Sequence, residues 1–531
     1  MKKTFRYLSM AALLVVGAII SGCSNDDNID NPQQPANNDN VVTLTASVSL
    51  DGGTGTRAII PSTGVKTFES TNHIAVIYKD GEGNTLKAES GALTLSNDDK
   101  TATFTVTLTN PASGGAVRYI YPATMAKEVA TTATISDDDA TINYTGLYSS
   151  QNGNLSTLGT NYDLAVFDGS MSGSALPVSA SLTNPLAICE FTLKDYVNTN
   201  ADITENVTSL TISDGPNTYN LTPSSLSKIY VAMKPVTNGH ISFTATTSTN
   251  TYCKAASGKT LEASKLYPID VSMISKATPL TLEALTAGNI RVTYTYSGGV
   301  GYFKMYSSKN GAGKSSITGD VTITVNAGDK VQFYGNGTTN TTYGDNPQVN
   351  ITGTAQTKVY GNIMSLLNET AFETATTLSD DYNFWGFFKD NTALTDASGL
   401  LLPSMTLVKS CYSSMFNGCT NLTAAPALPA TTLAQNCYWS MFYKCSNLTT
   451  APALPATTLQ NSCYRWMFNS CSNLSSVTCL ATSGINETYS TYEWLGSVAA
   501  SGTFTAASAA VWPDGIHGIP SGWTRVNYIA P

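Results

Sequence analysis

Charged side chains are scarce in this chain of 531 residues. They account for 12% of it, about half of the usual share, and the formal net charge at pH 7 is −9. An acidic chain with so few basic side chains does not suit nucleic acid as a partner. Beyond residue 22 the chain also lacks a run of the roughly 20 apolar residues that cross a bilayer. We therefore expect no membrane span after the N-terminal segment.

Histidine is nearly absent as well. The three histidines, His73, His240 and His517, lie far apart in different predicted domains, and none pairs with another at the spacing of metal ligands. The Gly-x-Ser-x-Gly motif of hydrolases is missing. Gly311–Ser315 resembles the end of a phosphate-binding loop, but Ser308 stands where that motif needs its first glycine. We predict no enzyme activity, no catalytic residues, no cofactor and no metal.

The N-terminus has the pattern of an exported protein. Basic residues at positions 2, 3 and 6 precede the apolar run from Leu8 to Ile20, and Ser-Gly-Cys23 follows. This pattern is typical of a secretory signal, here residues 1–22. Small residues directly before a cysteine resemble the lipobox of bacterial lipoproteins, which implies cleavage before Cys23 and lipid on its thiol and its new amino group. An ordinary signal peptide with an incidental cysteine is the alternative.

Residues 23–40 are rich in Asn, Asp, Gln and Pro. Such a composition cannot bury a core, so we predict a flexible tether. Ser24 to Asp27 resembles the acidic export tag that sends some lipoproteins to the outer face of the outer membrane. The resemblance implies a lipid-anchored protein of the outer membrane that faces outside.

Short alternating strands fill the next three blocks. From Val42 to Leu50 every second residue is apolar, which predicts a half-buried strand. Many such runs with turn residues between them, and no long helical period, indicate β-sandwiches. We place one sandwich at 41–168, a second at 169–273 and a smaller β domain at 274–375.

The order of several short motifs between about residues 41 and 273 resembles that of fimbrillin-like proteins. The matching pieces are Thr56-Arg57-Ala58, Phe68, Asn72 to Val76, Tyr119 to Pro122, Ile229 to Pro235 and Gly258 to Val271. The resemblance implies two transthyretin-like β-sandwich domains, a role in surface fimbriae or cell adhesion, and fimbrial subunits as partners. It also implies a protease cut after Arg57 and loss of the strand before it, so that a strand of the next subunit fills the groove. A solvated loop arginine that is never cut is the alternative.

Near-identical units recur with a period of 26 residues in the last third of the chain. Met-Phe-x-x-Cys-x-Asn-Leu starts at Met415, Met441 and Met467, each time after a Cys-Tyr pair. A fixed period of this length is typical of a solenoid, in which stacked units cover each other's apolar face. We assign the solenoid to 376–495 and a cap on its last coil to 496–531.

The Phe-x-x-Cys-x-x-Leu core and the Leu-Pro turn of each unit resemble BspA-like leucine-rich repeats. The period is longer than is usual there, and alanine stands where larger aliphatic residues are common. Cys437, Met441, Phe442 and Cys445 have the spacing of one helical face, and Leu448–Leu454 reads as a short strand. The whole chain is therefore predicted to be mainly β, with an α/β solenoid at its end.

Ten cysteines are present. Seven belong to the repeats, and we interpret them as a ladder of buried thiols, because an odd number does not pair off and two on one helical face are too far apart for a disulfide. In a degenerate first unit, Asn383 and Asn391 replace both cysteines, and asparagine can bond to a neighbouring coil's backbone. Joint replacement also fits a lost disulfide pair. Cys189 and Cys253 are read as small buried residues.

The repeats also carry the candidate ligand surface, because exposed apolar and aromatic residues mark recognition sites. It consists of Pro426, Leu428, Trp439, Tyr443, Pro452, Leu454 and Trp466. Tyr412, Tyr438 and Tyr464 either join it or stack between coils. The leading hypothesis is a fimbrial adhesin, with this chain at a tip, that binds a host or bacterial surface protein or glycan. The alternative is a stand-alone glycan-capture lipoprotein.

Overall fold

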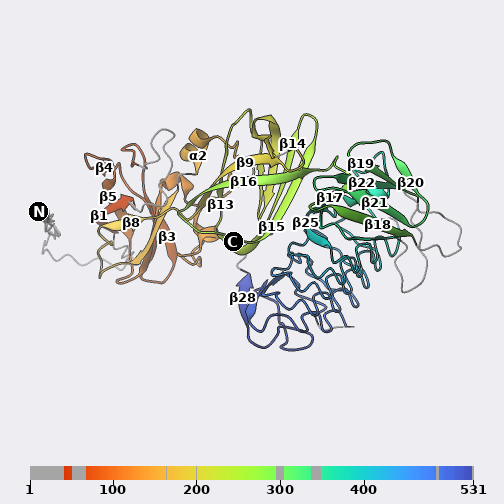
Figure 1. Ribbon diagram of the computed structural model, residues 1–531. Coiled ribbons are helices and arrows are strands. Elements are labelled where there is room, and N and C mark those ends of the chain that lie inside the picture. The colour runs from red at the N-terminus through yellow and green to blue at the C-terminus, as the bar shows by residue number, and fades with distance from the viewer. Residues whose placement is uncertain are drawn as a thin grey trace, which may run out of the picture. The chain divides into compact units, whose positions relative to one another are not determined.

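The computed structural model describes residues 41–50, 67–294, 304–335 and 349–528, apart from residues 163, 199, 379 and 486–488. Strands far outnumber helices in these ranges (Figure 1), so the expectation of a mainly β chain is confirmed. No helix in the described ranges is long and apolar enough to cross a bilayer.

The first β block contains two four-stranded sheets, with the orders β4-β5-β1-β8 and β3-β2-β6-β7. Their strands are β1 Val41–Leu50, β2 Ala75–Lys79, β3 Thr85–Glu89, β4 Thr94–Leu95, β5 Thr101–Thr109, β6 Ala116–Tyr121, β7 Ala165–Ser170 and β8 Ala180–Leu182. In β5 the apolar residues are buried and the threonines between them are mostly exposed, because side chains alternate between the two faces of a strand. Since β8 pairs in parallel with β1, this block extends to Leu182, past the boundary expected at residue 168.

A buried arginine connects a sheet of this block to a short helix. Arg118 of β6 donates from Nε and Nη2 to the two carboxylate oxygens of Asp168, each at 2.7 Å, and from Nη1 to Asp138 at 2.8 Å. Asp168 lies on β7, and Asp138 begins the short helix α1 (Asp138–Thr141). Two-point recognition of a carboxylate by guanidinium fixes geometry as well as charge, so Arg118 fixes the helix against the sheet.

Eight strands of the second β block form one connected sheet. The order is β10-β9-β16-β15-β14-β11-β12, and β13 pairs with β9. The strands are β9 Ala187–Asp195, β10 Ala201–Asp202, β11 Val207–Ser213, β12 Thr218–Leu221, β13 Ile229–Met233, β14 Val236–Thr247, β15 Thr251–Leu261 and β16 Leu266–Ser275. Only the pairs Tyr252–Ser275 and Cys253–Ile274 join β15 to β16. The helix α2 (Leu155–Asn161) contacts β13.

The third β block and the repeats share one sheet and one core. A six-stranded sheet has the order β20-β19-β22-β17-β24-β25, and a three-stranded sheet has the order β21-β18-β23. The strands are β17 Leu280–Ala284, β18 Gly288–Tyr294, β19 Met305–Lys309, β20 Ser315–Ile317, β21 Val321–Val325, β22 Lys330–Gly335, β23 Val349–Gly353, β24 Thr357–Asn362 and β25 Leu394–Leu401. Because β25 belongs to the first coil and pairs in parallel with β24, the boundary expected at residue 375 falls inside a continuous hydrophobic core that runs from Leu280 to Trp523.

The coils of the repeats stack through a ladder of backbone hydrogen bonds. Alternate amides donate to the next coil: Tyr412 to the Cys437 carbonyl at 3.0 Å and Ser414 to the Trp439 carbonyl at 2.8 Å. The amides between them close turns within their own coil, as Met415 does on the Tyr412 carbonyl at 3.3 Å. The same alternation recurs one period later. Nearly every backbone donor in this stretch is thus satisfied without a helix.

The helix expected in each unit is wrong. The described part of residues 376–531 contains no α-helix, and every fourth residue of a coil has a left-handed backbone, with φ of 57° at Asn436, 53° at Ser440 and 62° at Lys444. A right-handed helix cannot continue through such residues. The strand expected at Leu448–Leu454 is reduced to isolated parallel bridges from Thr450 and Leu454 to the next coil.

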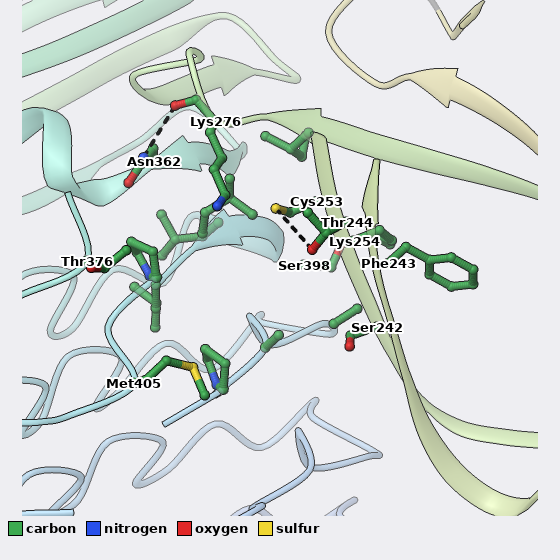
Figure 2. Close-up of a pocket in the computed structure, with 18 residues that line it drawn as sticks. Ser242, Phe243, Thr244, Cys253, Lys254, Lys276, Asn362, Thr376, Ser398 and Met405 are labelled. Carbon is green, nitrogen blue, oxygen red and sulfur yellow. Dashed lines mark hydrogen bonds between the residues drawn. The ribbon is translucent and has the colours of Figure 1, made fainter. Parts of the chain in front are cut away.

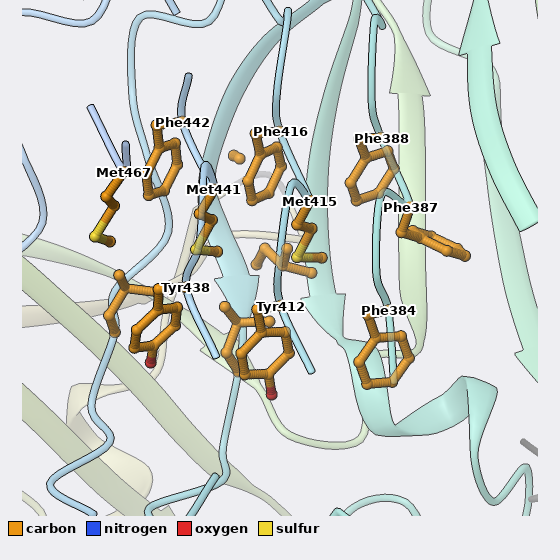
Figure 3. Close-up of a cluster of buried hydrophobic side chains, with 14 of the residues drawn as sticks. Phe384, Phe387, Phe388, Tyr412, Met415, Phe416, Tyr438, Met441, Phe442 and Met467 are labelled. Atoms are coloured by element: carbon orange, nitrogen blue, oxygen red, sulfur yellow. The ribbon is translucent and has the colours of Figure 1, made fainter. Parts of the chain in front are cut away.

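Aromatic side chains stack along the coil axis inside this ladder (Figure 3). Phe388, Phe416, Phe442 and Phe468 form one column, with neighbouring ring centroids 5.4–5.5 Å apart. A second column consists of Phe384, Tyr412, Tyr438, Tyr464 and Trp494, at 5.9–6.1 Å. The three tyrosines of this column are thus buried between coils and do not join the ligand surface. Burial raises the pKa of all three phenols well above its ordinary value.

The repeat thiols form a ladder of their own. The Sγ–H groups of Cys419, Cys445 and Cys471 donate to backbone carbonyls of the preceding coil at 3.0–3.2 Å. Asn391 takes the same position in the first unit and donates to the Ile351 carbonyl at 3.0 Å, as expected, whereas Asn383 has no hydrogen-bond partner. Every cysteine in the described ranges is unpaired. Buried, unpaired thiols agree with the ladder and not with disulfides inside a unit.

The C-terminal segment continues the stack. Three parallel strands, β26 Ser476–Cys479, β27 Gly502–Ala507 and β28 Trp523–Tyr528, form a sheet in that order. Trp512 stacks on Trp494 with centroids 5.2 Å apart and covers the end of the aromatic column. The Tyr528 hydroxyl donates to the Asp214 carbonyl of the second β block at 2.7 Å.

Candidate functional site

Two adjacent positions are among those that differ between the near-identical units. They follow the buried tyrosine of each coil and hold Ser413-Ser414 in the first full unit, Trp439-Ser440 in the second and Arg465-Trp466 in the third. The tyrosine and methionine on either side of them are buried, whereas Trp439, Arg465 and Trp466 are half-buried. The large side chains at these positions thus reach the surface, while the three serines are buried.

These variable positions and the coil after them form a patch that we name the aromatic edge. Its members are Trp439, Arg465, Trp466, Tyr489, Tyr492 and His517. The ring centroids of Trp439 and Trp466 are 6.1 Å apart, those of Trp466 and Tyr492 6.4 Å, and those of Tyr492 and His517 5.3 Å. Tyr489 is 58% exposed, which is unusual for a large ring in so regular a stack. The edge therefore offers a row of ring faces and ring edges to solvent.

Arg465 is the cation of the aromatic edge. Its guanidinium carbon lies 4.5 Å from the Trp466 ring centroid, 5.3 Å from that of Tyr492 and 5.5 Å from that of Tyr489. Among the described residues it has no carboxylate partner, and its Nε makes no hydrogen bond. The nearby Glu493 instead accepts a hydrogen bond from Trp466 Nε1 at 2.9 Å. Cation–π contacts hold Arg465 in place and leave its charge unpaired.

Trp466 occupies a left-handed backbone position. Its φ is 53°, and the equivalent Ser414 and Ser440 also lie in that region. This conformation recurs at every fourth residue of the coils, at the buried ring of Phe384 among others, so it belongs to the coil and not to the aromatic edge alone. Serine adopts the same backbone in two units, so the turn does not require the ring of Trp466.

The structure divides the residues expected to bind a ligand. Trp439, Tyr443 and Trp466 are half-buried and reach the surface. The other four, Pro426, Leu428, Pro452 and Leu454, are buried, so the strand side of the coils does not present these side chains to a ligand.

Four members of the aromatic edge were not predicted from the sequence as ligand-binding residues: Arg465, Tyr489, Tyr492 and His517. Two signals could have found them. Arg465 occupies one of the positions that vary between the units, and Tyr492 lies one period after Trp466. The backbone continues that period, because the Trp466 amide donates to the Tyr492 carbonyl at 3.0 Å.

The two expected processing sites, Cys23 and Arg57, lie outside the described residues. Within the described ranges no three His, Cys, Asp or Glu side chains gather as metal ligands.

Comparisons with known proteins give distant structural likeness. No family model and no curated protein matches the chain. A fimbrial assembly protein from Parabacteroides distasonis is 11% identical over 43% of this chain and 90% of its own, with a TM-score of 0.27. A putative cell adhesion protein from Bacteroides uniformis is 16% identical over 44% and 97%, with a TM-score of 0.25.

The tip fimbrial protein Mfa3 from Porphyromonas gingivalis, truncated at its C-terminus, is 11% identical over 44% of this chain and 95% of its own, with a TM-score of 0.23. These three structures are thus described as fimbrial and cell-adhesion proteins. At TM-scores this low, the likeness carries no argument about what the chain does.

Proposed function

We propose that this protein is a fimbrial adhesin of the cell surface, placed at a fimbrial tip, that binds a glycan through the aromatic edge of its coils. The observation that carries the proposal is the unpaired guanidinium of Arg465 among the rings of Trp466, Tyr489 and Tyr492. Flat, partly exposed rings stack on the apolar faces of sugars, and an unpaired guanidinium suits a carboxylate or sulfate on the same glycan. A protein ligand remains the second candidate for this surface.

Replacing Trp466 by serine is expected to weaken glycan binding about 30-fold, which corresponds to roughly 2 kcal/mol for a central aromatic contact. Serine is the residue that the other units carry at this left-handed position, so the coil is expected to keep its backbone conformation. The full chain is first tested on a glycan array, and its best ligand is then titrated by calorimetry.

Arg465→Ser and Trp439→Ser complete the set, because each introduces the side chain of the first unit. Lys409→Gln is the matched control, since Lys409 lies over the Tyr382 ring of an earlier coil. Unchanged affinity in Trp466→Ser would remove the aromatic edge from the proposal. If Trp466→Ser lowered the affinity for the glycan only as much as Lys409→Gln does, the binding would be attributed to non-specific charge.

The fimbrial part of the proposal rests on the resemblance to fimbrillin-like proteins and on the place of β1. This strand lies between β5 and β8, with nine residue pairs to β5 from Val41–Thr109 to Ser49–Thr101. Its loss would leave a groove with two open edges that an extended strand can fill. The strand β28 is paired with β27 and is not free to be donated. A subunit that accepts a strand at this groove and holds its own β28 in the fold suits a tip.

Protein shed from the cell surface is expected to begin at Ala58, because a cut after Arg57 separates it from Cys23. N-terminal sequencing of the shed form checks this, and Arg57→Ala is expected to prevent shedding. Arg291→Ala, at an exposed arginine elsewhere, serves as the control. If every recovered molecule starts at a lipidated Cys23 and no fimbrial subunit co-purifies, the stand-alone glycan-capture lipoprotein replaces the fimbrial adhesin.

We further propose that Cys23 carries a lipid anchor, that the protein lies in the outer membrane and faces outside, and that the coils are leucine-rich repeats. The first two rest on the lipobox and the acidic tag, and the third rests on the Phe-x-x-Cys-x-x-Leu core of each unit.

A further inference from the structure

A cavity of about 250 Å³ lies between the β14–β15 strand pair and the first coils. Its walls are mostly aliphatic, with Leu400, Leu402 and Met405 on the coil side and Ala255 and Ile274 on the sheet side. Figure 2 shows the labelled lining residues around this space. The cavity shares no residue with the aromatic edge.

Two lysines, Lys254 and Lys276, line the same cavity. Both are half-buried, and among the described residues neither ammonium group forms an ion pair or a hydrogen bond. Asp396 acts on Lys254 only from a distance, and its Oδ1 accepts a hydrogen bond from the Ser398 amide at 2.7 Å. Lys276 is held at its backbone, where its carbonyl accepts from Asn362 Nδ2 at 3.3 Å.

An unpaired ammonium beside aliphatic side chains is unfavourable, because burial takes it from water and returns no partner. Burial accordingly lowers the pKa of Lys254, which Asp396 partly offsets. Lys276 in turn is close enough to influence the thiol of Cys253. An anion that entered the cavity would supply the partner that both cations lack.

We propose that this cavity binds an aliphatic monocarboxylate of medium chain length. The carboxylate pairs with Lys254 and Lys276, and the chain packs against Leu400, Leu402 and Met405. A volume of about 250 Å³ holds roughly eight groups of the size of a water molecule, at about 30 Å³ each. A methylene group is of similar size, so a chain of about eight carbons fits, and a drug-sized ligand does not.

Calorimetric titration of the full chain with sodium octanoate tests the proposal. Octanoate is expected to bind, and octanol, which lacks the carboxylate, and acetate, which lacks the chain, are each expected to bind at least tenfold more weakly. Lys254→Met and Lys276→Met are each expected to weaken octanoate at least tenfold. Lys259→Met is the control for long-range charge, because Lys259 lies on the same strand as Lys254 but is exposed and does not line the cavity.

Three results would overturn the proposal: no binding of octanoate, equal binding of octanol, or equal weakening by Lys259→Met. Thermal melting of each variant shows that the fold is kept. If Lys254→Met does not fold, Ala427→Leu provides a second measurement, since Ala427 lines the cavity and a larger side chain there is expected to exclude octanoate. Octanoate bound as well by Ala427→Leu as by the natural protein would place the ligand elsewhere.

Discussion

Truncation of Phe442 to alanine is expected to lower the free energy of unfolding of the coils by about 3–5 kcal/mol. Phe442 is fully buried and stacks on Phe416 and Phe468, with centroids 5.4 and 5.5 Å apart and ring planes within 2° of parallel. Alanine would leave a cavity between three successive coils. Hydrogen bonds from alternate amides hold those coils at a fixed spacing, so they cannot close in on the cavity.

Denaturant unfolding followed by tryptophan fluorescence measures this effect. All six tryptophans lie between Trp385 and Trp523, so the signal reports on the coils alone. Phe442→Leu, which keeps most of the volume, is expected to cost less than half as much, and Asn447→Ala, at an exposed position, to cost almost nothing. A loss below about 1 kcal/mol in Phe442→Ala would contradict the column of stacked rings as the support of the coils.

Replacement of Cys23 by alanine is expected to move the protein from the membrane fraction to the soluble fraction. The expected change is all-or-none, because each acyl methylene contributes about 0.8 kcal/mol to membrane attachment and the variant cannot carry an acyl chain on a thiol. Labelled palmitate and fractionation of cells provide the two readouts. Cys189→Ala, at a fully buried thiol of the second β block, is expected to change neither.

Continued labelling of Cys23→Ala would show that lipid is attached elsewhere. Membrane association of an unlabelled Cys23→Ala variant would show that lipid is not the anchor. Either outcome would also change the meaning of a cut after Arg57, because release from the cell would no longer follow from losing residues 23–57.

Strands were the easiest elements to predict from the sequence. The alternation at Val42 to Leu50 predicts a strand that agrees with β1 to within one residue. A strand needs only a period of two and turn residues on either side. Block boundaries were harder to place, because β8 returns to pair with β1 and β25 pairs with β24. Pairings between distant segments leave no local signal.

The coils show why the period of a repeat can be predicted while its conformation is misjudged. Apolar residues spaced like Cys437, Met441 and Cys445 satisfy a helix, and they equally satisfy a run of turns with a left-handed residue at every fourth position. Ser440 and Ser462 have this left-handed backbone. Serine is compatible with a helix as well as with such turns, so its presence does not decide between them. The helix and the run of turns differ in that only the turns form hydrogen bonds from coil to coil. Those bonds require neighbouring coils to stack, and the sequence of a single unit does not show the stacking.

Of the residues predicted to form the ligand surface, some reach solvent and others are buried, because burial again depends on how the coils stack. Trp439 and Trp466 interrupt a constant unit and are therefore visible in the sequence. Leu428 and Leu454 belong to the constant part, and their burial follows from packing inside the stack. Arg465 gains its significance only when the next coil brings Tyr489 and Tyr492 beside it.

The hydrogen bond from the Tyr528 hydroxyl to the Asp214 carbonyl has a mechanical consequence. It closes the segment between these two residues into a loop by a non-covalent contact. Other contacts join the same parts, because the Tyr196 and Tyr360 ring centroids are 5.3 Å apart and Lys330 Nζ donates to the Val197 carbonyl at 3.5 Å. A force applied to a ligand held by the coils would therefore be divided between the covalent chain before β17 and these contacts with the second β block.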